Sequence, residues 1–195
     1  MHGLVLRAVQ QFVTDIYGSA TWTRITDAAS LEFDEFEAML TYGEEQGERT
    51  LAALTRVLNR PRAEFFEDIG TYLVSHPNTE AIRRLLRFGG FTFLEFLHSL
   101  DDLPDRARMA LPNLALPTLE LREHSASHFS LTCRGQIEGI GHVMMGLLRA
   151  MADDYGVLVL VEHRGGGQGS ETLVIKLLES SFAKGRDFEL GALLA

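Results

Sequence analysis

The chain has 195 residues, a length that suits a single domain or a domain with a small additional lobe. Hydrophobic residues make up 46% of it and charged residues 23%, as in an ordinary globular protein with a sizeable core. Its 27 acidic side chains outnumber its 18 lysines and arginines, so the formal net charge is −9 at pH 7. Because polyanions repel such a chain, we expect it to bind neither nucleic acid nor an anionic membrane surface.

The sequence shows no signal for export or for insertion into a membrane. The N-terminal residues lack a charged segment followed by an apolar stretch. Apolar runs such as Val143 to Leu148 are much shorter than the ~20 residues that span a bilayer. A single cysteine, Cys133, excludes an internal disulfide. We therefore expect a soluble, cytoplasmic protein.

Apolar residues recur at helical spacing through the first half of the chain. Gly18, Pro61 and Pro77 each follow one of these patterns and indicate its end. Gly89-Gly90 interrupts the fourth pattern, which resumes at Phe93. The patterns predict helices over residues 5–16, 51–58, 65–73, 82–86 and 93–100.

After Pro104 the pattern changes from helical to alternating. Leu111-Pro112 and Leu116-Pro117 indicate an extended linker, because the residue before a proline disfavours helix. Alternating apolar residues then predict strands, and a helical period returns between the second and third of them. The predicted ranges are strands over 119–121, 129–133, 157–162 and 172–178 and a helix over 139–155.

A run of helices followed by β-β-α-β-β predicts an α+β fold, with one helix packed on a four-stranded antiparallel sheet. Burial of Leu147 and Leu148 is a test of that packing. We expect a helical N-terminal subdomain over residues 1–62, an α/β lobe over 63–178 and a tail over 179–195. The tail is compatible with docking on a partner or another copy, and equally with covering the sheet edge.

Known catalytic and phosphate-binding motifs are missing from the sequence. The glycine cluster at 165–169 lies between two predicted strands and lacks the Gly-Lys-Ser/Thr ending of a phosphate loop, so it predicts a long, flexible hairpin loop. Cys133 lies on the apolar face of a predicted strand, where a thiol is inert. The seven histidines lack the spacing of a zinc site, and we expect them at the surface. No enzymatic activity is predicted.

Several short strings occur in an order and at a spacing that match one known family. They are Met1-His2-Gly3-Leu4-Val5, Tyr17-Gly18, Trp22, Gly70-Thr71-Tyr72-Leu73-Val74, the segment from Phe93 to Leu103, Leu111-Pro112-Asn113-Leu114, Pro117 and Met145-Gly146-Leu147-Leu148. Together they resemble the heme-nitric oxide/oxygen-binding (H-NOX or HNOB) domains, the bacterial relatives of the heme domain of soluble guanylate cyclase. The resemblance covers about residues 1–178 and implies a heme pocket and a role in nitric oxide sensing and signal transduction.

The resemblance also places the family's heme site on this chain. Pro104 stands at the position of the axial histidine, and a proline cannot ligate iron. Cys133, Gly135 and Ile137 stand at the tyrosine, serine and arginine of the Tyr-x-Ser-x-Arg motif, whose arginine holds the heme propionates. Pro112 matches the proline that presses on the porphyrin. By this resemblance the heme site is degenerate.

Neighbouring arginines are candidates for the lost contact with the propionates. Arg106 and Arg108 reach them if the linker allows it. Arg134 flanks the lost motif, but strand alternation directs it to the face opposite Cys133 and Gly135. Propionates buried without a cation would be uncompensated charges, which cost several kcal/mol.

Three residues are candidates for a substitute iron ligand. His142 and Met145 lie on the predicted helix that follows the lost motif, and Met145 also falls at a pocket position of the family. His98 precedes Pro104 by six residues, about 240° around a helix, so we expect it to face elsewhere.

Two functions are therefore open, and Pro104 favours the first. One is a heme-free regulatory or interaction domain, whose pocket is filled by side chains such as Phe93, Cys133, Ile137 and Met144 or holds another apolar ligand. The other is a nitric oxide or oxygen sensor that binds heme through a substitute ligand. In both cases the resemblance implies a separately encoded signalling partner, such as a histidine kinase or a cyclic-dinucleotide enzyme, because no output domain is recognised in this chain.

Overall fold

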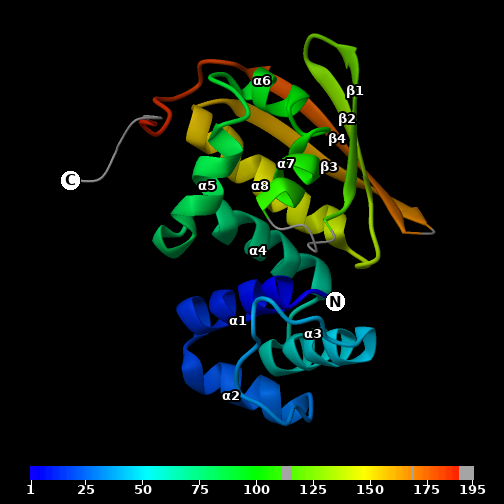
Figure 1. Cartoon of the computed structure of the whole chain (residues 1–195). Coiled ribbons are helices and arrows are strands. Elements are labelled where there is room, and N and C mark those ends of the chain that lie inside the picture. The colour runs from blue at the N-terminus through cyan, green and yellow to red at the C-terminus, as the bar shows by residue number, and fades with distance from the viewer. Residues whose placement is uncertain (111–115, 168, 189–195) are drawn as a thin grey trace. The chain divides into compact units, whose positions relative to one another are not determined.

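A computed structural model describes residues 1–110, 116–167 and 169–188 of the chain (Figure 1). The expected linker position Pro112 lies outside the described residues. Two compact units divide the chain, with their boundary between Phe65 and Phe66; the described parts are 1–65 in the first unit and 66–110, 116–167 and 169–188 in the second. No helix in the described ranges combines the length and the apolar character needed to cross a bilayer.

The first unit contains three helices, α1 (Gly3–Tyr17), α2 (Ser19–Ala28) and α3 (Glu44–Leu58). The predicted ranges 5–16 and 51–58 fall inside α1 and α3, whereas α2 was not predicted. Gly18 joins α1 to α2 with a φ of +86°, a conformation that favours glycine. The core of this unit includes Leu6, Val9, Phe12, Trp22, Ile25, Phe36, Leu51 and Leu54.

Helices α4 (Arg62–Ser75), α5 (Glu80–Arg87), α6 (Phe93–His98) and α7 (Leu103–Ala110) follow, with a short 3₁₀ helix η1 (Pro77–Thr79) before α5. The predicted break at Gly89-Gly90 is confirmed, because α5 ends at Arg87 and α6 begins at Phe93. Thr92 starts α6 with a capping box: its hydroxyl accepts from the Glu95 N–H, and the Glu95 carboxylate accepts from the Thr92 N–H.

The second unit is completed by strands β1 (Thr118–Ser125), β2 (His128–Arg134), β3 (Leu158–Gly167) and β4 (Ser170–Glu179) and by helix α8 (Ile140–Tyr155). The strands form one antiparallel sheet in the order β1-β2-β4-β3, and α8 lies along one face of it (Figure 1). Leu147 and Leu148 of α8 are both buried. The predicted α+β fold with a helix on a four-stranded sheet is confirmed.

The hairpin between β3 and β4 differs from its prediction. Strand β3 runs on through the glycines to Gly167, and β4 begins at Ser170, so the predicted long, flexible loop over 165–169 is wrong. The pairing of β3 with β4 shifts register between His163 and Gly166. Glycines allow this irregularity because they adopt turn-like backbone angles, and Gly165 has a φ of +76°.

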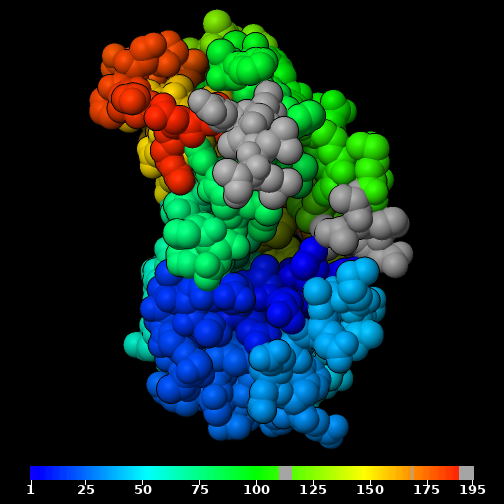
Figure 2. Space-filling view, turned by 60° about the vertical axis from the view of Figure 1, so that its left-hand side comes forward, coloured from blue at the N-terminus to red at the C-terminus, as the bar shows by residue number. Residues whose placement is uncertain are grey.

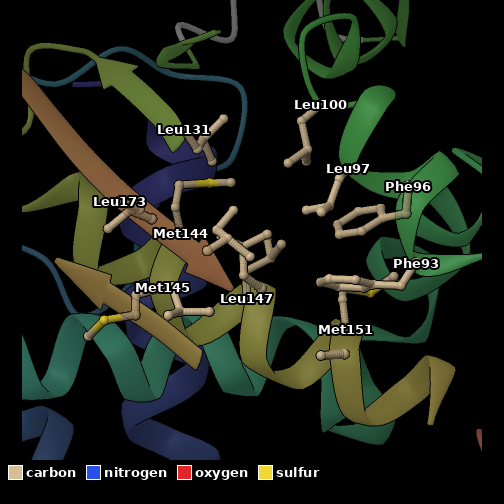
Figure 3. Close-up of a cluster of buried hydrophobic side chains, with 14 of the residues drawn as sticks. Phe93, Phe96, Leu97, Leu100, Leu131, Met144, Met145, Leu147, Met151 and Leu173 are labelled. Atoms are coloured by element: carbon tan, nitrogen blue, oxygen red, sulfur yellow. The ribbon is translucent and has the colours of Figure 1, made fainter. Parts of the chain in front are cut away.

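The core of the second unit lies between α6, α8 and the sheet (Figure 3). In Figure 3 the side chains of α6 and of the turn after it point towards those of α8. The members labelled there are Phe93, Phe96, Leu97, Leu100, Leu131, Met144, Met145, Leu147, Met151 and Leu173.

Helices α4 and α8 approach each other closely through two glycines. A Cβ atom at Gly70 would contact the backbone of Val143, and one at Gly146 would contact the backbone of Glu67. Both neighbours are backbone atoms, which cannot move aside as a flexible side chain can. Glycine at these two positions therefore permits the approach and brings the first turns of α8 against α4.

Residues 180–188 follow β4 and pack on the far end of α8. The N–H groups of Phe182 and Ala183 both donate to the Gly156 carbonyl at 3.0 Å, and the Arg186 N–H donates to the Asp154 carbonyl at 2.8 Å. Arg83 of α5 donates to the Asp187 carbonyl at 3.2 Å. Figure 2 shows this stretch, orange to red, at the surface. Its contacts are with α5 and with the end of α8.

Candidate functional site

Pro104 is the second residue of α7 and is buried. A proline is tolerated in the first turn of a helix because its missing N–H would have no partner there. Its ring nitrogen is part of the peptide backbone and carries no lone pair for a metal. The neighbouring side chains of Leu103 and Ala107 are buried as well, so this face of α7 contributes only apolar groups.

His98 does not share a helix with Pro104. Helix α6 ends at His98 and α7 begins at Leu103, so the angle of about 240° between the two residues rested on a continuous helix and was wrong. The His98 side chain is 48% exposed, and its Nε2 lies 3.4 Å from a carboxylate oxygen of Glu123.

Cys133 is fully buried in β2, as predicted. It lies opposite Leu119 of β1 and Glu171 of β4. Burial, with a smaller contribution from the Glu171 charge, raises the pKa of the Cys133 thiol to about 12. The group is therefore a neutral thiol at pH 7.

Gly135 and Ile137 follow the end of β2. The Gly135 N–H donates to the Gly169 carbonyl at 2.9 Å, and a Cβ atom at Gly135 would lie 3.3 Å from the Pro117 Cβ. Ile137 is half-buried and lies outside the buried cluster, so its expected place among the pocket-filling side chains is wrong. Phe93, Cys133 and Met144, expected there as well, are members of that cluster.

The three arginines considered as propionate partners have other neighbours. Arg134 is exposed and donates to the Glu120 carboxylate at 2.9 Å, on the face opposite Cys133 as expected. This hydrogen bond, together with Arg122, lowers the pKa of Glu120. Arg108 pairs with Asp105 at 2.8 Å and is more than half exposed.

Arg106 is the only one of these three arginines that is partly buried. Its Nη2 donates to the backbone oxygen and to the hydroxyl of Ser99, at 3.2 Å and 3.3 Å. Its Nε is buried and has no hydrogen-bond partner among the described residues. A buried donor without a partner costs about 1–3 kcal/mol.

The two substitute ligand candidates on α8 differ in their surroundings. Met145 is buried, and its thioether belongs to the apolar cluster. His142 is half-buried and lies outside that cluster. Its ring stacks on the ring of His163, with 4.2 Å between the centroids and 19° between the planes.

His142 is one member of a group of three metal-ligating side chains, with His163 of β3 and Glu171 of β4. The His163 Nε2 lies 2.7 Å from the Glu171 Oε2. One ligand atom from each of the three residues lies within 4.8 Å of the others. Burial, and then the neighbouring His163, lower the pKa of His142.

Sequence reasoning missed this cluster because its members come from three separate elements. Spacing along the chain does not reveal it, because no helical or knuckle spacing links residue 142 with residue 163. The hairpin brings His163 and Glu171 together across the β3–β4 pairing, close to the register shift after His163. The signal available in the sequence was a histidine and a glutamate on the two strands of one predicted hairpin.

Comparison with known proteins gives a consistent result. The family model described as Haem-NO-binding (HNOB) matches residues 2–163. The soluble guanylate cyclase gcy-31 of Caenorhabditis elegans is 25% identical over 154 residues, which are 79% of this chain and 22% of that protein. The soluble guanylate cyclase 89Db of Drosophila melanogaster is 19% identical over 155 residues, 80% of this chain and 23% of that protein. The chain thus spans less than a quarter of the length of these relatives.

Solved structures share the fold. An H-NOX protein from S. oneidensis in the Fe(II)NO ligation state has a TM-score of 0.76 at 16% identity, over 92% of this chain and 100% of that chain. The Fe(II) unliganded H-NOX protein from K. algicida has a TM-score of 0.80 at 16% identity, over 94% of this chain and 100% of that chain. Because the family model matches most of its length, the chain belongs to the Haem-NO-binding family, a family of sensory domains.

Proposed function

We propose that this chain is a sensory or regulatory signalling domain that has lost the heme ligation of its family. It works as a heme-free interaction domain, or it takes an apolar ligand. The observation that carries the proposal is Pro104, which is buried in the first turn of α7. The resemblance in sequence assigns this residue to the position of the family's axial histidine. Without that imidazole, iron is neither positioned nor tuned by the protein at this point.

The chemistry expected around heme propionates is also missing from the matched positions. Cys133 is a buried neutral thiol, Gly135 has no side chain, and Ile137 is apolar. Arg134 is exposed and paired with Glu120. Since buried carboxylates without a cation cost several kcal/mol, these residues do not fit the propionates of a heme. Arg106 is the one partly buried arginine considered for them.

A gas sensor with a substitute iron ligand is the alternative function. The surroundings of the two histidines count against it, because His98 lies exposed beside Glu123 and His142 stacks on His163 outside the apolar cluster. Met145 is the buried donor among the three candidates. Its thioether alone would have to hold the iron, and this supports the heme-free function.

Signalling requires a partner or an output domain. We infer that the partner is a signalling enzyme, with a histidine kinase or a cyclic-dinucleotide enzyme as the first candidates. The support is membership of a sensory family whose guanylate cyclase relatives are several times longer than this chain. We also infer a cytoplasmic location from membership of this sensory family.

Titration of the full chain with hemin, followed by visible absorption, tests the heme-free function. Wild-type protein is expected to perturb the hemin spectrum no more than an unrelated control protein does. Two variants show whether the missing imidazole explains the absence of heme binding. Pro104→His supplies an imidazole at the family position, and Pro104→Ala removes the proline without supplying one. A saturable Soret change that appears only in Pro104→His would show that loss of the ligand alone abolished binding.

One result overturns the proposal. A sharp Soret band in wild-type protein, at one heme per chain and shifted by nitric oxide, would make the chain a gas sensor. Loss of that band in Met145→Leu, His142→Ala or His98→Ala would then identify the substitute ligand. Absence of a Soret change in wild type and in both Pro104 variants would support a pocket filled by its own side chains.

A further inference from the structure

We propose that His142, His163 and Glu171 bind a divalent transition-metal ion of the Zn²⁺ class, which would link the start of α8 to the β3–β4 hairpin. The three side chains come from three elements of the second unit and converge at one half-buried point. This site is separate from the positions that match the family's heme ligand, and the inference does not depend on the proposed function.

The distances between the donor atoms are close to those a metal requires. Zinc binds imidazole nitrogen and carboxylate oxygen at ~2.1 Å, so tetrahedral ligand atoms lie ~3.4 Å from one another. Here the ligand atoms of all three residues lie within 4.8 Å of one another, and the closest pair, His163 Nε2 and Glu171 Oε2, is 2.7 Å apart. Metal binding would also require the stacked His142 and His163 rings to turn out of their stack, so that an in-plane nitrogen lone pair of each points at the ion.

Backbone groups hold the carboxylate in place. Glu171 Oε1 accepts the Gly139 N–H at 2.8 Å, and Oε2 accepts the Gly141 N–H at 3.2 Å. Such outer contacts orient a metal ligand and fix which oxygen faces the ion. Gly141 also provides space, because a Cβ atom there would lie 2.7 Å from Glu171 Oε2 and 2.9 Å from His163 Nε2.

His163 must exchange tautomers to bind through Nε2. Its Nδ1 accepts the Gly165 N–H at 3.1 Å, so in the neutral ring Nε2 carries the proton and donates it to Glu171. When the metal takes the Nε2 lone pair, that proton leaves to solvent and Nδ1 gains one, so no net proton is released. The Gly165 N–H then loses its acceptor on the ring; Gly165 lies within the register shift between His163 and Gly166.

The donor set selects the class of ion. Two imidazoles and one carboxylate suit Zn²⁺ and its neighbours in the transition series, whereas Ca²⁺ and Mg²⁺ prefer six or more oxygen ligands. Three protein ligands leave a fourth tetrahedral position for water.

The test is Zn²⁺ binding to the full chain after treatment with a chelator, measured by equilibrium dialysis and metal analysis. Wild type is expected to bind one Zn²⁺ per chain, with no competition from Ca²⁺ or Mg²⁺. His142→Ala, His163→Ala and Glu171→Gln are each expected to lower the affinity at least about 100-fold. His98→Ala is the matched control, because His98 lies beside Glu123 at 3.4 Å and so forms a histidine–carboxylate pair outside the cluster.

Thermal unfolding with and without Zn²⁺ gives a second readout that does not depend on stoichiometry. A ligand that binds only the folded chain raises its Tm, so Zn²⁺ should raise the Tm of wild type and of His98→Ala but not of His142→Ala. His142 is half-buried, so this variant keeps the experiment decisive even if His163→Ala fails to fold. Wild-type affinity no higher than that of His142→Ala, or an equal loss in His98→Ala, would overturn the proposal and leave a metal-free histidine–glutamate contact.

Discussion

At the scale of single residues, burial decides what a side chain can do. Cys133 is the only thiol in the chain and would be a nucleophile if it were exposed and ionised. It is fully buried, and burial raises its pKa from 9.0 to about 12.

The Cys133 thiol is expected to resist alkylation. A pKa higher by about three units lowers the thiolate fraction at pH 7 about 1,000-fold, and burial adds a barrier to the reagent. Native protein should therefore react with iodoacetamide at least about 1,000-fold more slowly than the chain in denaturant, as followed by mass spectrometry. Rapid stoichiometric labelling of the native protein would contradict the buried position.

The pH dependence of this group has a definite sign. The folded-state pKa is raised, so the contribution of the neutral thiol to stability is fully present below pH 9 and is lost as the pH rises from 9.0 towards about 12. Cys133→Ala removes the titrating group. We expect the loss of stability between these two pH values to be smaller in that variant than in wild type, measured by urea unfolding across the pH range.

At the scale of elements, the contact of α4 with α8 depends on two residues without side chains. We expect Gly146→Ala to lower the free energy of unfolding by about 2 kcal/mol or more, because the added Cβ would contact the Glu67 backbone of the facing helix. Gly70→Ala should act in the same direction through the Val143 backbone. Urea unfolding followed by circular dichroism measures both changes.

A third glycine is the matched control for these two. Gly167 lies in β3, and a Cβ atom there would have no heavy atom within 4 Å. Gly167→Ala is therefore expected to change stability by less than about 0.5 kcal/mol. If all three alanine variants were equally stable, the close approach of α4 and α8 would be wrong.

Sequence periodicity predicted the elements that bury one regular apolar face. Helix α1, helix α8 and all four strands fall in this class, and so does the burial of Leu147 and Leu148. Helix α2 was not predicted, because its threonine-rich sequence buries only Trp22, Ile25 and Thr26 and shows no long apolar stripe. Helix α7 was not predicted, because Pro104 indicates the end of a helix in the sequence. In the structure the proline lies in the first turn of α7, where a helix accommodates it.

The features of the candidate sites that depend on a single strand were predictable, and those that depend on contacts between elements were not. The buried, inert state of Cys133 and the outward direction of Arg134 followed from strand alternation. The cluster of His142, His163 and Glu171 did not follow, because it depends on the β3–β4 pairing and on a register shift that periodicity does not encode. Contacts between elements require the topology, and the order β1-β2-β4-β3 was not predictable from the two hairpins alone.

At the scale of the whole molecule, ionic contacts tie residues 180–188 to α5 and to the end of α8. The Asp154 carboxylate is 1% exposed and accepts from Arg83 at 2.7 Å, and Arg87 and Arg186 lie 3.5 Å and 3.7 Å from it. The Arg87 guanidinium lies over the Tyr155 ring, 3.9 Å from its centroid. Arg83 makes the short contact with this buried carboxylate, and Arg186 adds a longer one from the segment that follows β4.

Removal of that segment is expected to destabilise the protein. Truncation after Glu179 deletes three backbone hydrogen bonds to Gly156 and Asp154 and the acceptor of Arg83 at Asp187. At about 1 kcal/mol for each of these four net hydrogen bonds, the loss is about 4 kcal/mol, and the Tm should fall by about 8–16 °C. Truncation after Phe188 is the matched comparison, because the difference between the two shortened chains isolates residues 180–188. Equal Tm values for both would mean that this segment adds no stability and is available to a partner.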